Sequence, residues 1–356
     1  MDLDDLNFIR YHDPHGMLTE IDKLPEQLQS AWELGGRLSL DEFKTLSGIN
    51  RVLITGMGGS AIGADLLAAY ASATCRSPIV VHRDYGLPAW ANGPETLVIA
   101  SSHSGNTEET LDSFETALNQ DCRILAISTG GKLAQRAAEA GTPVWLFEHA
   151  GQPRAAVGFS FGLLLAALAR LGLIPDPGLE LLDAIAAMHG RQDGLRADTP
   201  TAENPAKRMA GQLVGYWVNV YGAGFLAPVA RRWKGQINEL AKAGAGFELL
   251  PEADHNMLAG IHFPEKALSR IFQLFLGAPS LHPRNRLRLE RTRQAMMVEG
   301  LNTDHYEAYG ASVLAQMWNA ILFGDYTAFY LAMEYGIDPW DTSMLEQFKN
   351  SMRTGD

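Results

Sequence analysis

Two short segments of this sequence carry the residue types that bind a phosphate group. The first is Gly56-Met57-Gly58-Gly59-Ser60 and the second is Ser102-His103-Ser104-Gly105-Asn106-Thr107. Each follows an apolar, β-branched run and precedes a helix-compatible sequence, which predicts a turn between a strand and a helix. Glycines let the backbone approach a ligand closely, and hydroxyls together with the free N–H groups of a helix start form an anion site. The predicted phosphate-binding residues are Gly58, Gly59, Ser60, Ser102, Ser104 and Thr107.

The first turn alone leaves other interpretations open. Gly56-x-Gly58-x-x-Ala61 matches the dinucleotide-binding fingerprint, and Asp84 lies 28 residues after Gly56. Ser60 could also be only the cap of a helix. The second turn favours a phosphate monoester, because hydroxyls and backbone amides suit that ligand and a dinucleotide fold needs no second hydroxyl-rich turn. An ordinary serine-rich loop remains the alternative there, and His103 receives no role.

The segments around these turns alternate as in a parallel sheet wrapped by helices. Between residues 51 and 172, short apolar runs predict strands and the stretches between them predict helices. The strands are expected at 52–55, 79–81, 97–100, 124–128 and 144–147, and the helices at 61–71, 107–119 and 132–140. Such sheets bind ligands at the carboxyl ends of their strands, where both turns are expected to lie.

The second half of the sequence repeats the order strand, glycine turn, helix, but it has no serine-rich turn. A strand is predicted at 217–221, a glycine turn at 222–224, a helix at 226–240 and a strand at 247–250. Residues 16–48 and 157–171 have helical patterns, and 309–335 predicts two helices interrupted at Gly324-Asp325. We therefore expect an N-terminal helical lead-in at 1–48, a first domain at 49–173 and a second domain at 204–356.

Composition narrows the function classes. The chain has 356 residues and a formal net charge of −12, which argues against nucleic acid or an anionic membrane as a partner. Its two cysteines, Cys75 and Cys122, form no metal-ligand pattern and fit a reducing cytoplasm. The acidic start, Met1 to Asp5, lacks the basic and apolar regions of a signal peptide. An anionic small molecule stays compatible with the negative charge, because local N–H groups can hold a phosphate.

Further motifs follow the two turns in a recognisable order. They are Gln152-Pro153-Arg154-Ala155-Ala156, Lys234-Gly235-Gln236-Ile237-Asn238-Glu239, Pro251-Glu252-Ala253-Asp254-His255-Asn256, and the stretch from Gly324-Asp325-Tyr326 to Gly336-Ile337-Asp338-Pro339. With the turns, they resemble the bifunctional phosphoglucose/phosphomannose isomerase family, which is built from sugar isomerase (SIS) domains. The resemblance covers about residues 50 to 345.

The resemblance implies an α/β fold with two SIS-type domains, each a parallel sheet flanked by helices in a flavodoxin-like three-layer sandwich. It implies an aldose–ketose isomerase that interconverts glucose 6-phosphate or mannose 6-phosphate with fructose 6-phosphate. It also implies a homodimer whose only ligand is the hexose 6-phosphate, with no cofactor and no metal.

Aldose–ketose isomerisation removes a proton α to a carbonyl and returns it one carbon away. The reaction needs a carboxylate base, a cation near the enediolate oxygen and an acid for ring opening. By their places in the family motifs, Glu239 is the expected base, Arg154 the cation and His255 the ring-opening acid. Glucose and mannose 6-phosphates differ only at C2, so loss of the C2 proton gives both the same enediol.

One departure from the family pattern concerns a lysine. Some members have a lysine in the last helix, taken to assist ring opening, but the stretch from Gly324 to Pro339 has none and Tyr330 takes its place. A phenol donates a hydrogen bond but brings no positive charge at neutral pH. Lys234 and Lys242 are possible substitutes. The alternative function is a non-catalytic phosphosugar-binding protein, and an NAD(P)-dependent enzyme on the Gly56 fingerprint is a third hypothesis.

Overall fold

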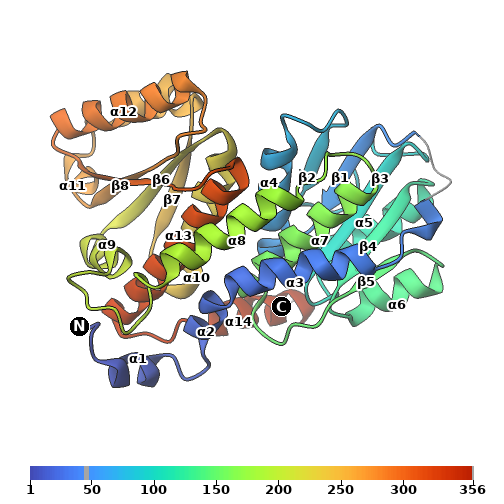
Figure 1. The fold of residues 1–356 in the computed structure, drawn as a ribbon, viewed down its shortest axis with the longest axis horizontal. Coiled ribbons are helices and arrows are strands. Elements are labelled where there is room, and N and C mark those ends of the chain that lie inside the picture. The colour runs from blue at the N-terminus through green and yellow to red at the C-terminus, as the bar shows by residue number, and fades with distance from the viewer. Residues whose placement is uncertain (44–47, 355–356) are drawn as a thin grey trace. The chain divides into compact units, whose positions relative to one another are not determined.

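The computed structural model describes residues 1–43 and 48–354 (Figure 1). Two parallel sheets flanked by helices form two compact units. The first-sheet unit comprises Lys23–Met188 and Gly310–Trp318, and the second-sheet unit comprises Met1–Asp22, His189–Tyr309 and Asn319–Asp356. The expected α/β class with a parallel sheet in each half is confirmed. Residues 1–22 group with the second half of the chain, although the lead-in was expected as one segment over 1–48.

The first sheet has the strand order β2-β1-β3-β4-β5, with every neighbouring pair parallel. Its strands are β1 (Arg51–Thr55), β2 (Ile79–His82), β3 (Thr96–Ser102), β4 (Arg123–Ser128) and β5 (Val144–Leu146). The helices that follow them are α4 (Gly58–Ala71), α5 (Glu108–Asn119), α6 (Gly131–Glu139) and α7 (Val157–Arg170). The chain runs outward in opposite directions from β1 and β3, which pair with Thr55 opposite Ala100. Doubly wound sheets bind ligands at this switch point, and both glycine–serine turns leave it.

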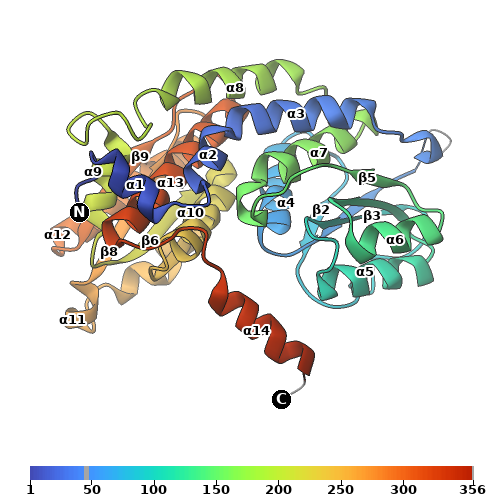
Figure 2. The ribbon, with the colours of Figure 1, turned by 90° about the horizontal axis from the view of Figure 1, so that it is seen from below.

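The lead-in of the first-sheet unit is one helix packed on α7. Residues 16–48, expected to be helical, contain α2 (Met17–Asp22), α3 (Leu24–Arg37) and the 3₁₀ turn η1 (Asp41–Phe43), while residues 44–47 lie outside the described residues. Helix α3 lies against α7 because small residues meet there: a Cβ on Gly162 would stand 2.6 Å from Ala31. The same two helices run side by side in Figure 2.

The second sheet has the order β7-β6-β8-β9 and is also parallel throughout. Its strands are β6 (Trp217–Ala223), β7 (Ala245–Leu250), β8 (Ile271–Gly277) and β9 (Asn302–Glu307). The helices that lie wholly in the second-sheet unit are α2 together with α1 (Leu6–His12), α9 (Pro205–Leu213), α10 (Ala227–Leu240), α11 (Glu265–Leu268), α12 (Pro283–Val298) and α14 (Ser343–Thr354). Helix α8 (Gly178–Gln192) belongs to the first-sheet unit up to Met188, and α13 (Val313–Tyr335) belongs to the second-sheet unit from Asn319 onward. Short 3₁₀ turns complete it: η3 (Gly224–Leu226), η4 (Glu252–His255) and η5 (Met257–Gly260).

The predicted break at Gly324-Asp325 is wrong, because α13 is one continuous helix. Gly324 serves a close contact instead of a turn: a Cβ there would lie 2.3 Å from the indole Nε1 of Trp233. Asp325 accepts two hydrogen bonds from Arg232 of α10, from Nε at 3.1 Å and from Nη2 at 2.5 Å. Both side chains of this ion pair are buried, at 3% and 4% exposure. The glycine and the aspartate therefore join α13 to α10.

Replacing Asp325 by Ala is expected to destabilise the protein strongly. The change leaves the buried Arg232 guanidinium without this carboxylate, and breaking a buried pair from one side costs about 3–5 kcal/mol. Denaturant unfolding followed by circular dichroism measures the loss. The matched control is Glu139→Ala, which removes a surface partner of Arg136 and should have a much smaller effect, because water already solvates both charges. A loss for Asp325→Ala no larger than the control's would contradict the prediction.

Candidate active site

The two glycine–serine turns lie side by side at the carboxyl ends of β1 and β3. Ser60 is the third residue of α4, and its Oγ accepts a hydrogen bond of 3.1 Å from the backbone N–H of His103 in the second turn. The residue in the N-cap position of α4 is Met57, so the interpretation of Ser60 as the helix cap is not what the structure shows. Ser60 and Ser102 are buried, at 4% and 2% exposure. The first turn and the second are thus fixed to each other by a hydroxyl.

The second turn is ordered by its own hydroxyl groups. Ser102 Oγ and Thr107 Oγ1 lie 3.0 Å apart, and Ser102 Oγ also accepts from the N–H of Gly105 at 3.1 Å. Ser104 is exposed, and its Oγ accepts from the N–H of Asn106 at 3.2 Å. Neither Met57 nor Thr107, the N-cap residues of α4 and α5, makes a side-chain capping bond. Both helix starts follow strands that meet at the switch point and carry no side-chain cap, which suits an anion site.

Arg154 is brought to the first turn by the close approach of backbones. It lies in the 3₁₀ turn η2 (Pro153–Ala155) after β5, and a Cβ on Gly59 would stand 2.3 Å from the carbonyl oxygen of Pro153. Gln27 of α3 holds the last residue of η2, because its Nε2 donates to the carbonyl of Ala155 at 2.9 Å. Arg154 is buried, at 4% exposure. The backbone of η2 thus packs on the first turn, and a buried positive charge attracts negative charge more strongly than an exposed one, since the local dielectric is low.

A pair of imidazoles stands beside the second turn. Nε2 of His103 lies 2.9 Å from Nδ1 of His149, in the segment that leads from β5 to Arg154. The rings pack on Phe147 and Phe159, which stack with centroids 5.1 Å apart. Burial among these rings, and secondarily the neighbouring His149, lowers the pKa of His103 to about 4. His103 is therefore neutral at physiological pH.

The shifted pKa of His103 predicts an acid-sensitive stability. Its pKa is about 4 in the folded protein against an ordinary value of 6.5, so between these pH values the unfolded chain binds more protons. The free energy of unfolding should thus fall as the pH drops from 6.5 to 4, by about 1–2 kcal/mol after allowing for the ring's partial exposure. Denaturant unfolding at pH 7.5 and 4.5 measures this fall in the free energy of unfolding. In His103→Gln the fall should be smaller by about 1–2 kcal/mol. Equal pH dependence in both proteins would contradict the assignment.

Glu239 and His255 belong to the second-sheet unit and lie at opposite edges of its sheet. Helix α10 leaves the carboxyl end of β6 and returns, so Glu239 in its last turn lies at the amino edge, just before β7. His255 ends η4, after the carboxyl end of β7. The six residues of β7 put about 20 Å between the two edges. A single copy of this unit therefore does not bring the expected base and the expected acid together.

His255 is exposed, and the residue before it is firmly anchored. Asp254 accepts hydrogen bonds from Arg288 Nη1 and Thr292 Oγ1 of α12, both at 2.7 Å. This double contact fixes η4 on α12. The imidazole of His255 is thus presented to solvent from a rigid support.

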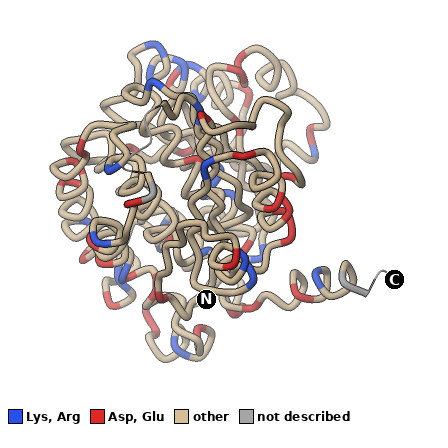
Figure 3. The backbone as a smooth tube through the Cα atoms, turned by 90° about the vertical axis from the view of Figure 1, so that its right-hand side faces the viewer, with Lys and Arg blue, Asp and Glu red and all other residues tan. Residues whose placement is uncertain are grey.

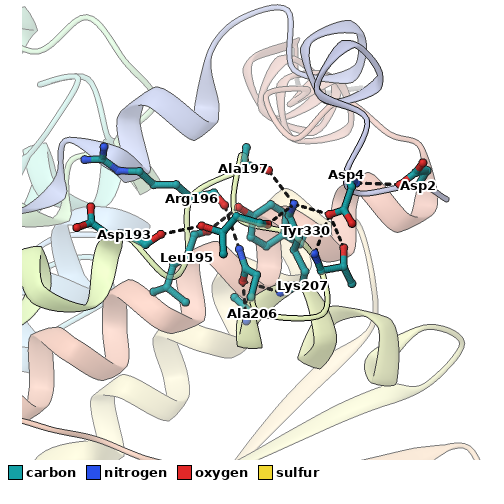
Figure 4. Close-up of polar contacts among 12 residues, drawn as sticks. Asp2, Asp4, Asp193, Leu195, Arg196, Ala197, Ala206, Lys207 and Tyr330 are labelled. Carbon is teal, nitrogen blue, oxygen red and sulfur yellow. Dashed lines mark hydrogen bonds and ion pairs between the residues drawn. The ribbon is translucent and has the colours of Figure 1, made fainter.

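Tyr330 does not stand in for the family lysine, because it is buried in a closed polar cluster (Figure 4). Its hydroxyl donates to the carbonyl of Leu195 at 2.6 Å. Lys207 Nζ lies 5.6 Å from the ring centroid and donates to Asp4 Oδ1 at 3.0 Å and to the carbonyls of Ala197 and Thr199. This cluster fastens the N-terminal segment to α9 and α13.

The last helix of the chain is α14, beyond the stretch in which the lysine was sought. It carries the exposed Lys349. The apolar spacing of Met344, Phe348 and Met352 is the helical signal that could have found this element. Figure 2 shows α14 leading away from the second sheet. Lys349 is thus a lysine in the last described helix that the sequence analysis did not consider.

No group of His, Cys, Asp and Glu side chains suited to a metal ion is found within residues 1–43 and 48–354. Across those same ranges no helix is long and apolar enough to cross a membrane. Acidic and basic residues alternate along the backbone traced in Figure 3 and, within the described part of the chain, do not form long runs of one sign.

Comparison with known proteins gives a consistent result. The model of the bacterial phospho-glucose isomerase C-terminal SIS domain matches residues 202–352. The bifunctional phosphoglucose/phosphomannose isomerase of Caldicellulosiruptor bescii is 38% identical, covering 94% of this chain and 98% of its own length. The enzyme of the same name from Aquifex aeolicus is 32% identical, with 88% and 93% coverage.

Solved structures share the fold at lower identity. A glucose-6-phosphate isomerase like protein from Thermus thermophilus superposes with a TM-score of 0.65 at 18% identity, covering 97% of this chain and 99% of that one. Tagatose-6-phosphate ketose/aldose isomerase from Escherichia coli gives 0.66 at 16% identity, with 91% and 94% coverage. The expected pair of SIS-type sheets is thus confirmed as a fold.

Proposed function

This chain belongs to the bifunctional phosphoglucose/phosphomannose isomerase family, and from that premise we propose that it interconverts glucose 6-phosphate and mannose 6-phosphate with fructose 6-phosphate. The observation that carries the proposal is the pairing of two uncapped helix starts and Arg154 at the switch point of the first sheet. That arrangement suits a phosphate monoester with a further negative charge developing beside it.

The phosphate of the substrate is assigned to the two turns. Backbone N–H groups at the starts of α4 and α5 supply directed donors, and exposed Ser104 adds a hydroxyl. The ordered contacts among Ser60, Ser102 and Thr107 hold the turns in place before the ligand arrives. The proposed set is Gly58, Gly59, Ser60, Ser102, Ser104 and Thr107.

Chemistry at C1 and C2 is assigned to the distant residues of the chain. Glu239 removes the proton from C2 of the open-chain aldose and returns it to C1, and Arg154 stabilises the negative oxygen of the enediolate between these steps. His255 protonates the ring oxygen, opening the ring. Lys349 is the proposed counterpart of the last-helix lysine that some family members carry. Return of the proton to either face of C2 gives glucose or mannose 6-phosphate.

The proposed assembly is a homodimer. Support comes from the second sheet, since Glu239 and His255 lie at opposite edges of it and a second copy can supply the missing partner. The proposed location is the cytoplasm, which fits the free thiols of Cys75 and Cys122.

A chromatographic assay that separates the three hexose 6-phosphates tests the proposal. The purified protein should convert fructose 6-phosphate to both glucose 6-phosphate and mannose 6-phosphate without added metal or nicotinamide cofactor. The non-catalytic alternative expects tight binding of a hexose 6-phosphate without turnover. Binding with no formation of either aldose would therefore overturn the isomerase proposal.

A further inference from the structure

His103 lies within the second turn but has no part in the proposed phosphate site, and it contacts three other loops at the same edge of the first sheet. Its N–H donates to Ser60 Oγ after β1, and its carbonyl accepts from N and Oγ1 of Thr129 after β4, at 3.1 and 2.6 Å. Its side chain reaches His149 after β5. Four carboxyl-end loops therefore meet at His103.

The contact with His149 matters because of where that segment goes. His149 is the third residue after β5, and η2 with Arg154 follows shortly after it. Gln27 fixes the far end of this segment through the carbonyl of Ala155 and the N–H of Gly158. At the near end, the N–H of Phe147 donates to the carbonyl of Ser128, and a side-chain hydrogen bond of His149 ties the segment to the second turn.

The bond is built to stay formed at neutral pH. The imidazole of His103 is half-buried, and His149 and Phe147 both meet it edge to face, with centroids 5.2 and 5.8 Å away. A neutral imidazole has one N–H and one acceptor nitrogen, so two neutral rings can share one N–H···N bond. Phe147 beside His103 and Phe159 beside His149 cover part of the pair and reduce the competition from water.

We propose that the His103–His149 hydrogen bond is a positioning device that holds the Arg154 segment against the phosphate turns, and so sets the enediolate-stabilising geometry of Arg154. The inference rests on the proposed function. Neither histidine is a catalytic residue in this scheme, because they act through Arg154. Displacement of a charge-stabilising group by about 1 Å can cost up to about 100-fold in rate, so a single hydrogen bond is enough to matter.

The test compares variants that remove the bond with variants that keep it. His149→Phe fills the aromatic cluster but has no ring nitrogen, whereas His149→Asn keeps a polar atom at the place of Nδ1. We expect His149→Phe to lower kcat by about tenfold or more with KM for fructose 6-phosphate changed by less than about threefold, and His149→Asn to restore kcat. His149→Ala makes the same comparison should the Phe variant fold poorly. The control His12→Phe removes a half-buried imidazole of the second-sheet unit and should leave kcat unchanged.

A double-mutant cycle decides whether the pair acts through Arg154. In the Arg154→Met background, His149→Phe should have no further effect on kcat. An undiminished loss of kcat there would overturn the proposal, as would a loss that appears wholly in KM.

Calorimetric binding of 5-phospho-D-arabinonate, which carries a carboxylate where the enediolate forms, gives a readout independent of turnover. His149→Phe should weaken this analogue about tenfold while inorganic phosphate binds as before. If the wild type binds the analogue but converts no hexose 6-phosphate, the proposed function is wrong. The effect of His149→Phe on binding of the analogue still tests the positioning role of the histidine pair.

Discussion

Glu239→Gln is expected to lower kcat by about 10³-fold for both hexose 6-phosphates, since a general base contributes about 10²–10⁴-fold. The amide has the shape of the carboxylate but no basic oxygen, so it cannot accept the C2 proton. We propose that the two glycine–serine turns hold the phosphate, and KM for fructose 6-phosphate should therefore change by less than about threefold. Loss of activity toward the two epimers should be equal, because both pass through one enediol.

Solvent exchange separates this role from a structural one. In deuterium oxide the wild type should exchange the C2 hydrogen of glucose 6-phosphate for deuterium as it turns over, and Glu239→Gln should not. The matched control is Glu139→Gln, a carboxylate at the end of α6 that should keep full activity. Exchange at C2 by Glu239→Gln at the wild-type rate would assign the base to another residue.

The first sheet is predictable because its signals are local. Each strand from β1 to β5 is an apolar run bounded by turn residues, and the glycines of the two turns stand where backbones approach closely. In the second sheet neither β8 nor β9 was predicted, although β8 is an apolar run that a local pattern could have found. For β9 the local signal is weak. Its sequence, Asn302 to Glu307, is polar with one buried aromatic, Tyr306, and only pairing with β8 makes it a strand. Tertiary pairing overrides weak strand preference here.

Two further errors of the sequence-based prediction also come from tertiary contacts. The pair Gly324-Asp325 looks like a helix break, but Trp233 and Arg232 of α10 explain both residues within an unbroken helix. His103 received no role because its partner His149 is 46 residues away in sequence. Contacts of this kind are set by sheet order, which a local pattern does not encode. Motif order brought Arg154, Glu239 and His255 forward as candidates, and the placing of the last two at opposite sheet edges came only from the structure.

Arg154→Met should lower kcat by about 10²–10³-fold, the loss found when one donor to a developing oxyanion is removed. Arg154 is buried next to the first turn, so water cannot replace the charge that stabilises the enediolate. Met has a similar length and no charge, and Arg154→Lys, which keeps the charge but not the planar fork, should fall between Arg154→Met and the wild type.

Two ligands distinguish this electrostatic role from a role in holding phosphate. Arg154→Met should weaken the binding of 5-phospho-D-arabinonate about 100-fold, whereas inorganic phosphate, held by the turns, should bind within about threefold of the wild type. The control Arg136→Met removes an exposed guanidinium between Glu115 and Glu139 and should change neither ligand. If Arg154→Met weakens the binding of both ligands equally, the guanidinium contacts the phosphate group. Another cation would then have to stabilise the enediolate. The structure favours the first outcome, because two uncapped helix starts already offer the phosphate its donors.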